Sequence, residues 1–393
     1  MNPISLKNYA AFVLTKRFVF SLFIALALFT GIKQYAKGSF NNYKIFKYTY
    51  FHTVNQTSLY DAYPKEYNDV NHYGPVFSII IAPFAVLPDP IGTSLWNIAN
   101  VLILCIGFYS LPLPLKSRSL IALICAHEAF GAMLSFQFNI ALTGFILLSF
   151  SYIVKQKEVK SALIIALGTL IKLYGIVGLA FFFFSKRKLT FILGGLASLA
   201  LLFVLPISLS SPQFIVDTYK EWYSCLIEKN TLNTSLTSMQ DISLMGIVRR
   251  VSGNPLIPNT PFLMAGFLLF ALPYIRVKQY QYIGYRLMLL ASVLIFTVIF
   301  SSGSESPTYI IAFAGVAIWF VVQPSPKKNW MIALFVFAII LTTLSPSDLF
   351  PKYIRIHYVW KYSLKALPCV LIWFAIIYQL LTVDFKTHQF LEE

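Results

Sequence analysis

The chain has 393 residues, of which 58% are hydrophobic and only 12% are charged, and its mean hydropathy is +0.70. A soluble protein of this length could not bury so much apolar surface, so the surrounding solvent must be a lipid bilayer. The net charge of +16 is spread over the ends of apolar segments and forms no continuous basic face, which argues against nucleic-acid binding and favours contact with membrane lipids.

Apolar segments follow one another along the chain, with no interval that suggests a soluble domain. We therefore expect an all-α polytopic membrane helix bundle, a single integral membrane domain over residues 1–393, with roughly 10–13 membrane helices. Several segments are shorter than the ~20 residues that a perpendicular helix needs. The apolar segments of the chain, short and long together, are in order Phe18–Ile32, Pro75–Leu87, Leu95–Leu111, Leu120–Phe136, Ile140–Val154, Ser161–Phe184, Leu189–Ile207, Pro261–Ile275, Gly284–Phe300, Thr308–Val322, Trp330–Leu344 and Leu367–Leu381.

The first apolar segment follows Lys7, Lys16 and Arg17, and no small-residue cleavage site comes after it. Because positive residues are retained on the cytoplasmic side, we expect this segment to remain as a span, with the N-terminus in the cytoplasm. The long polar stretch 33–73 would then lie on the outer side.

This first outer loop is the richest in polar groups. It begins with Asn42–Val54, in which aromatic and apolar residues recur at helical spacing, so we expect an interfacial helix there. A carboxylate beside a membrane re-entry could serve as a general base, although a single loop carboxylate is usually only solvated. The candidate polar residues are Asn41, Asn42, Asp61, Glu66, Asp69, His72 and Tyr73.

Ionisable residues inside apolar segments are the next candidates, since each costs about 2.5–3.5 kcal/mol at a helix centre. His127 and Glu128 lie in one such segment and Lys172 lies in another. They indicate a polar cavity for a substrate headgroup, a structural Glu128–Lys172 pair, or side chains that reach the membrane surface from near a span end. Gln137 and Asn139, at a break between segments, are either loop-capping amides or groups that bind a sugar or phosphate.

Two positive clusters, Lys155–Lys160 and Lys186–Lys188, bound the segment that contains Lys172. If both clusters are cytoplasmic, the segment between them cannot be a single span. It would instead be a pair of half-helices with Lys172-Leu173-Tyr174-Gly175 at the tip. Two further polar stretches, Ser208–Thr260 and Ser301–Pro307, are expected on the outer side, the former with a second interfacial helix over Ser211–Glu228.

Several familiar catalytic patterns are missing from the sequence. The four cysteines form no CxxC pair, so neither a zinc site nor a disulfide framework is indicated. There is no HExxH, GxGxxG or Walker pattern and no Ser-His-Asp order, which removes soluble-type nucleotide and metal chemistry from the leading options.

A series of short motifs recurs along the chain in a characteristic order: Ser58-Leu59-Tyr60, His72-Tyr73-Gly74-Pro75-Val76-Phe77, Ile81-Ala82-Pro83-Phe84-Ala85-Val86-Leu87-Pro88, Leu95-Trp96-Asn97 with Asn100, Gln137-Phe138-Asn139, Ile171-Lys172-Leu173-Tyr174 and Ser306-Pro307-Thr308-Tyr309. In order and spacing this series resembles glycosyltransferase family 87, the polyprenyl-phosphate-mannose-dependent alpha-mannosyltransferase-like membrane enzymes of the C-type fold. The resemblance covers most of the chain, and the ending, with Leu349-Phe350-Pro351-Lys352 and Lys365-Ala366-Leu367-Pro368-Cys369, is similar to a Bacteroidetes-type branch.

The resemblance implies a multi-pass enzyme of the plasma (inner) membrane that moves a hexose, mannose first, from a polyprenyl-phosphate donor to a glycan or glycolipid hydroxyl on the outer face. It implies a membrane domain with a conserved-type half over 1–207 and the remaining spans over 208–393. No cofactor is implied besides the donor lipid, and nothing in the residues requires a metal. The alternatives are a membrane transporter or lipid flippase, or a catalytically inactive family member.

The sequence departs from the family pattern at two places. Family members usually carry a base Asp early in the first outer loop, whereas this chain reads Phe40-Asn41-Asn42-Tyr43, so Asp69, and behind it Asp61 or Glu66, would take the role. Where the family often has a His before the Tyr of the late outer turn, this chain has Thr308, near the candidate residues Glu305 and Tyr309. Contacts to the donor phosphate would then come from Lys172, Arg249 or Arg250.

Overall fold

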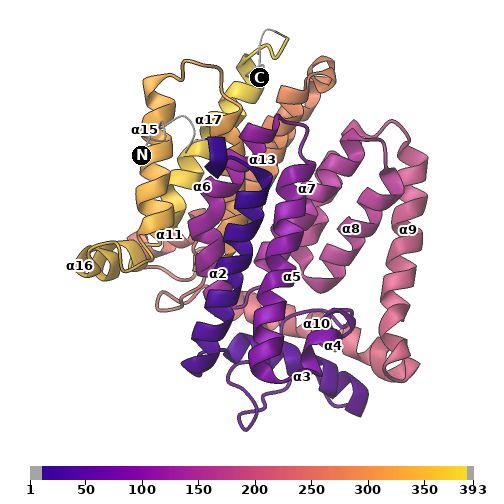
Figure 1. The fold of residues 1–393 in the computed structure, drawn as a ribbon. Helices are drawn as coiled ribbons and strands as arrows, with labels where there is room; N and C mark the ends of the chain where they lie inside the picture. The colour runs from indigo at the N-terminus through magenta and orange to yellow at the C-terminus, as the bar shows by residue number, and fades with distance from the viewer. Residues whose placement is uncertain (1–10, 387–393) are drawn as a thin grey trace, which may run out of the picture. The chain divides into compact units, whose positions relative to one another are not determined.

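A computed structural model describes residues 11–386 of the chain, and within that range every regular element is a helix. Five of these helices are long and apolar enough to cross a membrane: Lys16–Ala36, Asp89–Ser110, Leu115–Leu134, Lys188–Ser208 and Leu364–Thr382. Shorter apolar helices accompany them, such as Asn139–Val154 and Ile283–Ile299. The predicted all-α polytopic bundle is confirmed (Figure 1), while the number of spans stays a prediction.

Internal contacts divide the chain into two compact units. The first unit comprises Met1–Leu111 and Ala129–Glu228, and the second comprises Pro112–Glu128 and Lys229–Glu393. The helix α6 (Leu115–Leu134) contributes residues to both. The expected single membrane domain with halves 1–207 and 208–393 stays a prediction, because compact contact units need not coincide with functional halves.

The first unit is built around α7 (Asn139–Val154), which is buried along nearly its full length. It packs against α5 (Asp89–Ser110) where Gly107 and Gly144 meet, and a Cβ on Gly107 would lie 2.9 Å from Gly144 Cα. Small residues allow this close approach of two helix backbones, as is common in membrane bundles. The remaining helices of the unit are α2 (Lys16–Ala36), α3 (Asn41–Asn55), α4 (Phe77–Ala85), α8 (Glu158–Ile171), η1 (Leu173–Phe184), α9 (Lys188–Val204), η2 (Leu205–Ser208) and α10 (Pro212–Leu232).

The predicted broken helix pair is confirmed. α8 ends at Ile171, Lys172 is extended (φ −147°, ψ 123°), and the 3-10 helix η1 then runs back along α8. Gly175 packs so closely on Gly168 that an added Cβ would lie 2.2 Å from its carbonyl carbon. Each of these two helices is shorter than the ~20 residues that a span needs. The chain reverses direction between them, and Lys172 lies at that turn.

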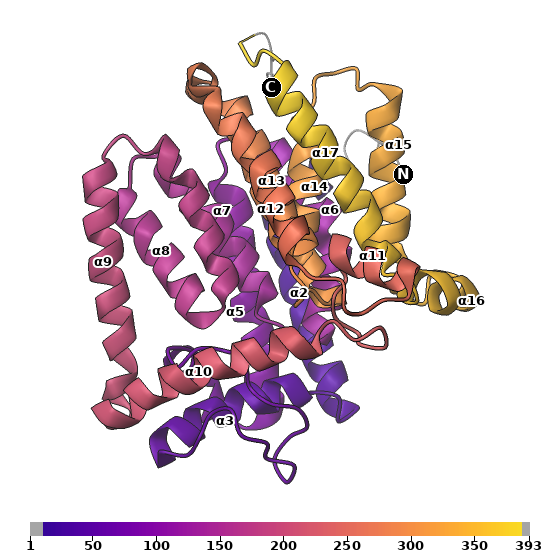
Figure 2. The ribbon, with the colours of Figure 1, turned by 180° about the vertical axis from the view of Figure 1, so that it is seen from behind.

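Helices also form at both predicted interfacial segments, α3 and α10. Figure 2 shows them running across the direction of the long helices of the same unit. On α3 one face is buried, through Tyr43, Phe46 and Thr49, while Lys44 and Lys47 are partly exposed. Their position at a membrane surface stays a prediction.

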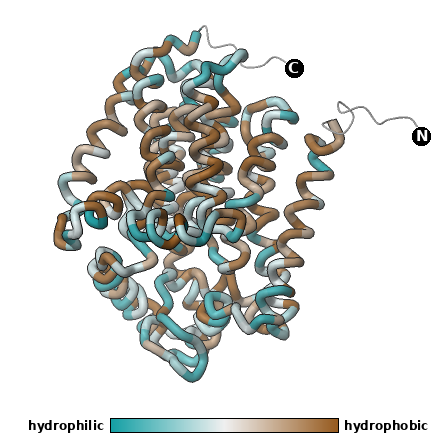
Figure 3. Tube along the Cα trace, turned by 90° about the vertical axis from the view of Figure 1, so that its left-hand side faces the viewer, coloured by the Kyte–Doolittle hydropathy of each residue, from teal (hydrophilic) through white to brown (hydrophobic). Residues whose placement is uncertain are grey.

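The second unit is centred on three apolar helices: α13 (Ile283–Ile299), α14 (Tyr309–Val321) and α17 (Leu367–Thr382). Polar side chains between them are paired, since Trp319 Nε1 donates to Gln379 Oε1 over 2.8 Å and Trp373 Nε1 donates to Ser292 Oγ over 3.0 Å. Figure 3 shows the hydrophobic brown colour along much of the upright helices of the chain, with hydrophilic teal at many bends and in the lower segments. The other elements of this unit are α11 (Leu244–Ser252), α12 (Thr260–Ala271), η3 (Leu272–Ile275), η4 (Val277–Gln281), η5 (Ser306–Thr308), α15 (Asn329–Ala338), η6 (Ile339–Leu344), α16 (Lys352–Ile354), η7 (Arg355–Trp360) and η8 (Leu364–Ala366).

Candidate functional site

A lysine ammonium group lies at the tip of the broken helix pair in the first unit. Lys172 Nζ donates to Asn139 Oδ1 over 2.9 Å, and Asn139 Nδ2 donates to Gln137 Oε1 over 3.2 Å. The ammonium lies 5.7 Å from the ring centre of Tyr73 and 5.1 Å from that of Tyr174. The structure therefore brings four predicted binding residues, Tyr73, Gln137, Asn139 and Lys172, into one cluster, which we call the Lys172 cluster.

The local backbone explains why these groups meet. The turn between α6 and α7 passes through a positive φ of 53° at Phe136, and α7 then begins at Asn139. The loop 33–73 is tied to the tip, because Gly74 N donates to Ile171 O over 3.0 Å and so satisfies a carbonyl at the end of α8. Only glycine fits there, since a Cβ on Gly74 would lie 2.0 Å from Leu170 O.

The loop segment before Gly74 is held in place by α10. Trp222 Nε1 donates to His72 O over 3.0 Å, and His72 Nδ1 lies 3.2 Å from Cys225 Sγ. The Tyr60 hydroxyl donates to Tyr73 O over 3.0 Å. His72, predicted to bind substrate, thus contacts α10 through both its backbone and its ring.

The three candidate base carboxylates have different surroundings. Glu66 Oε2 lies 2.8 Å from His52 Nε2, whereas Asp61 and Asp69 are exposed. Burial lowers the pKa of the His52 imidazole, and the neighbouring Glu66 opposes that shift. Glu66 is therefore engaged within the loop, which leaves Asp61 and Asp69 as the exposed carboxylates.

Asn41 and Asn42, two of the predicted substrate-binding residues, have structural partners. Asn41 Nδ2 donates to Asn68 O over 2.6 Å and Asn41 Oδ1 accepts from Asn68 N over 2.8 Å. Asn42 Nδ2 donates to Ser135 O over 2.8 Å. Asn41 thus holds Asn68, the residue just before Asp69. Asp69 itself has a positive φ of 76°, so Asn41 lies beside a segment that carries a carboxylate.

In the second unit, Glu128 forms a buried ion pair that the sequence did not predict. Lys365 Nζ lies 3.1 Å and 3.2 Å from the two Glu128 carboxylate oxygens. The same ammonium donates to Ser306 O and Oγ over 3.1 Å and 3.0 Å and lies 5.0 Å from the ring centre of Tyr309. The alternative of a Glu128–Lys172 pair is therefore wrong, because Glu128 is paired with a lysine at the start of the last apolar helix.

Arg249 is enclosed by protein groups. Its guanidinium bonds to Asp241 and Asn259, and Arg249 Nε donates to Ile257 O over 2.9 Å. The residue is only 1% exposed. Burial raises the pKa of the Asp241 carboxyl, while the Ser243 hydroxyl and Arg249 lower it, so this pair stabilises its loop at a desolvation cost.

The late polar turn is ordered by its own side chains. The Glu305 carboxylate accepts from the backbone N–H of Thr308, and Thr308 Oγ1 accepts from Glu305 N over 3.2 Å, which forms a capping box for η5. The Tyr309 hydroxyl donates to Ile242 O over 2.8 Å. Tyr309 also lies under Lys365, so this turn contributes to the buried lysine's surroundings.

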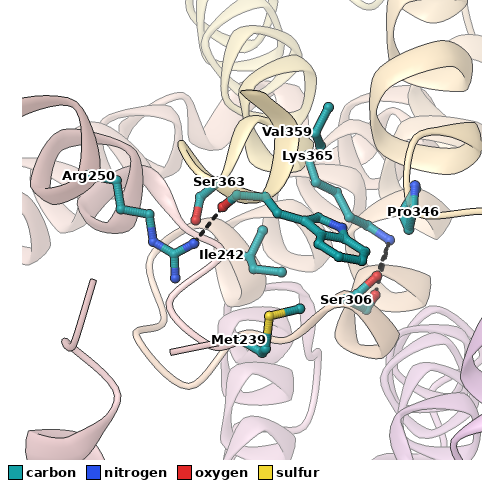
Figure 4. Close-up of a pocket in the computed structure, with 9 residues that line it drawn as sticks. Met239, Ile242, Arg250, Ser306, Pro346, Val359, Ser363 and Lys365 are labelled. Atoms are coloured by element: carbon teal, nitrogen blue, oxygen red, sulfur yellow. Dashed lines mark hydrogen bonds between the residues drawn. The ribbon is translucent and has the colours of Figure 1, made fainter. Parts of the chain in front are cut away.

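A small cavity adjoins this lysine within the second unit. Its lining includes Lys365, Ser306, Ser363 and Arg250 (Figure 4), together with the Trp360 side chain. Its volume is about 40 Å³. The sequence reasoning raised Arg250 as a contact of the donor phosphate but not Lys365 or Ser306.

The sequence did not predict Lys365 as a site residue, because a lysine directly before an apolar segment is usually a topology signal. The sequence did contain one signal, because Glu128 lies inside an apolar segment and a carboxylate there needs a partner.

The predicted site residues divide between the two units. The first unit holds Asn41, Asn42, Asp61, Glu66, Asp69, His72, Tyr73, Gln137, Asn139 and Lys172, and the second holds Glu128, Arg249, Glu305 and Tyr309.

Within residues 11–386, no group of three or more His, Cys, Asp or Glu side chains could hold a metal ion. What the described residues offer instead is an ammonium group among amides and aromatic rings, with carboxylates in the adjoining loop. Amide and ammonium groups bind sugar hydroxyls, and carboxylates can accept a proton from an attacking hydroxyl.

These features define a polytopic helical membrane protein with polar side chains clustered at a helix break. The model of glycosyltransferase family 87 matches residues 71–302, and the chain belongs to that family. The protein is therefore a membrane glycosyltransferase. The matched range includes Tyr73, Gln137, Asn139 and Lys172 but begins just after Asp69. A search of the curated proteins gives no match.

Proposed function

We propose that the protein is a hexosyltransferase that moves a sugar, mannose first, from a polyprenyl-phosphate donor to a hydroxyl of a glycan or glycolipid acceptor. The observation that carries this proposal is the Lys172 cluster, which presents an ammonium, an amide pair and aromatic faces at the tip of a helix break in a family 87 chain. In the reaction the acceptor oxygen attacks the anomeric carbon, its proton passes to a base, and the bond to the lipid phosphate breaks.

In this proposal the Lys172 cluster binds the sugar. Lys172 and Gln137 are half-buried and Asn139 is fully buried, so water has limited access to these groups. Hydrogen bonds made in such a site are stronger than those in bulk water. The rings of Tyr73 and Tyr174 flank the ammonium and provide apolar faces for the carbohydrate.

Asp69 is the proposed base. Its carboxylate is exposed, its backbone is held at positive φ, and Asn41 fixes the preceding residue through two hydrogen bonds. Glu66 is a poorer candidate because its carboxylate already contacts His52. Asp61 is exposed as well and is the matched alternative in the same loop.

We place the protein in the plasma (inner) membrane, with its N-terminus in the cytoplasm and the loop 33–73 outside. The exposed lysines of Lys155–Lys160 and the cations of Lys186–Lys188 support this orientation, since such residues are retained on the cytoplasmic side. The reaction needs no resident cofactor, so we expect transfer to continue in the presence of EDTA.

The test is sugar transfer by purified protein in lipid nanodiscs, with labelled polyprenyl-phosphate-mannose and a pool of membrane glycolipids. Loss of a general base costs about 10²–10⁴ in rate, so Asp69→Asn should lose transfer by that factor while Asp61→Asn keeps it. The reverse pattern would move the base to Asp61. If the wild type transfers no mannose and no other hexose from polyprenyl phosphates, the proposed donor is wrong.

A further inference from the structure

The connection 345–363 in the second unit joins two apolar helices, Asn329–Leu344 and Leu364–Thr382. The ends of these helices adjoin, because Thr342 Oγ1 donates to Lys365 O over 2.9 Å. The connection therefore leaves the bundle and returns to it at the same place. Between two membrane helices, such a connection begins and ends at one face of the bilayer.

The middle of the connection is helical and has one buried side. Arg355 and Val359, four residues apart in η7, are buried. Arg355 Nη1 donates to Asp348 Oδ1 over 2.9 Å, and its guanidinium carbon lies 5.4 Å from the ring centre of Trp360. Arg250 Nη1 donates to Trp360 O over 2.8 Å. These contacts fix the connection to its own unit, so its other side is a defined surface.

That outer side carries large apolar and aromatic side chains. Leu349 is 76% exposed and Tyr353 is 65% exposed, so both contact little protein. The other exposed members are Ile354, Ile356, Tyr358 and Trp360. Figure 1 and Figure 2 show α16, which contains Tyr353, extending sideways from the end of α15. A contiguous apolar surface of this kind marks a contact with a partner or a membrane.

Two lysines accompany the apolar side chains. Lys352 and Lys361 are exposed, and among residues 11–386 neither forms an ion pair. The Lys361 ammonium lies 5.2 Å from the ring centre of Tyr362. The carboxylate of the connection, Asp348, bonds to Arg355. The two lysine charges are therefore left without a balancing acid.

An aromatic surface with two unbalanced cations narrows the kind of partner. A wholly apolar partner would remove water from the ammonium groups and offer no opposite charge. An anionic membrane surface offers both parts, since tyrosine and tryptophan rings favour the headgroup level and lysines are attracted to anionic headgroups. The bilayer is also the neighbour that the two flanking apolar helices already bring to this connection.

We propose that residues 349–361 are a membrane-surface anchor, in which Lys352 and Lys361 bind anionic phospholipid headgroups and the exposed rings enter the headgroup layer. An amphipathic segment binds such a surface through its buried apolar area and its electrostatic attraction together. The anchor concerns the lipids of the bilayer and not the substrate, so it does not depend on the proposed function.

The test is photolabelling of the full-length protein in nanodiscs that contain equal amounts of phosphatidylcholine and phosphatidylglycerol. One lipid at a time carries a photoreactive group near its headgroup, and mass spectrometry identifies the labelled peptides. A lysine at an anionic surface contributes about 1 kcal/mol, so phosphatidylglycerol should label residues 349–361 about fivefold more than phosphatidylcholine. Equal labelling by both lipids would overturn the role of the lysines, and labelling by neither would overturn the membrane contact.

Two sets of variants separate charge from apolar contact. Lys352→Gln combined with Lys361→Gln should abolish the preference for phosphatidylglycerol, whereas Lys328→Gln, at an exposed lysine just before α15, should leave it unchanged. Tyr353→Ser combined with Tyr358→Ser should lower labelling by both lipids and keep the preference. A folded double lysine variant with the wild-type preference would overturn the proposal.

Two further measurements distinguish the membrane from other partners. Salt screens exposed charges, so the preference for phosphatidylglycerol should fall as the salt concentration rises. A preference that salt does not change would contradict the electrostatic contact. Residues 349–361 that crosslink to a second copy of the chain, and to neither lipid, would make this surface an interface between copies and overturn the anchor.

Discussion

Lys172 and Arg249 both stood out from the sequence as cations that could bind substrate, and the structure gives them opposite surroundings. Arg249 is 1% exposed and is held by Asp241, Asn259 and a backbone carbonyl. Lys172 is half-buried, and its hydrogen-bonding partner Asn139 is a neutral amide. The Arg249 guanidinium therefore bonds to a buried carboxylate, whereas the described hydrogen bond of the Lys172 ammonium goes to an uncharged group.

For these two cations, the group to which the side chain bonds indicates its role better than the position of the residue in the sequence does. A buried ion pair is costly to break, because removing one member leaves an uncompensated charge. Removing the Lys172 ammonium leaves no uncompensated charge on the neutral Asn139 amide. Changes at Arg249 should therefore affect stability, and changes at Lys172 should affect activity.

The largest effect is expected at Arg249. Arg249→Met leaves the Asp241 carboxylate buried without its cation, which should lower the free energy of unfolding by about 3–5 kcal/mol. Thermal unfolding of the detergent-solubilised protein measures it. Adding Asp241→Asn should recover part of the loss. A stable Arg249→Met protein with reduced donor affinity would make Arg249 a substrate residue instead.

Lys172→Met should lower the rate of sugar transfer by about 10²–10³, the usual cost of losing one donor that stabilises charge in a reaction. The melting temperature should stay near that of the wild type, because the amide left behind is neutral. Lys160→Met, at an exposed lysine on α8, is the matched control. Transfer within twofold of the wild type would remove Lys172 from the site.

A smaller effect is expected at the helix break itself. In Gly175→Ala the added methyl would lie 2.2 Å from the Gly168 carbonyl carbon, so the two arms must separate, at a cost of about 1–3 kcal/mol. Gly195→Ala on α9 is the control, since its nearest neighbour would be Ala162 Cβ at 3.8 Å. Equal melting temperatures for the two variants would mean that the arms do not pack as described.

The smallest effect concerns the pH dependence of the loop 33–73, which contains His52. Burial lowers the pKa of His52 below its ordinary 6.5, so the unfolded loop binds more protons than the folded loop as the pH falls through that value. Stability is therefore complete above pH 6.5 and declines below it, toward the lowered pKa. Limited proteolysis of the loop against pH measures this, and His52→Gln should flatten the profile.

Sequence alone supported several features because their signals are local. Apolar segments, positive clusters and aromatic spacing predicted an all-helical membrane chain, helices at α3 and α10, and a helix break at Lys172, all of which the described residues contain. The motifs that resemble family 87 were also sufficient to identify the family, because their order along the chain is a stronger signal than any single motif. These are properties of neighbouring residues.

Tertiary structure alone decided which charges pair. Glu128 lies 237 residues from Lys365, and nothing local distinguishes that lysine from a topology signal at the end of an apolar segment. The roles of Asn41, Arg249 and Arg250 likewise depend on which loop folds against them. Hydropathy sets where a segment lies in the bilayer, but the partner of a buried charge is set by packing between distant helices, because only a contact of a few ångströms can offset its desolvation.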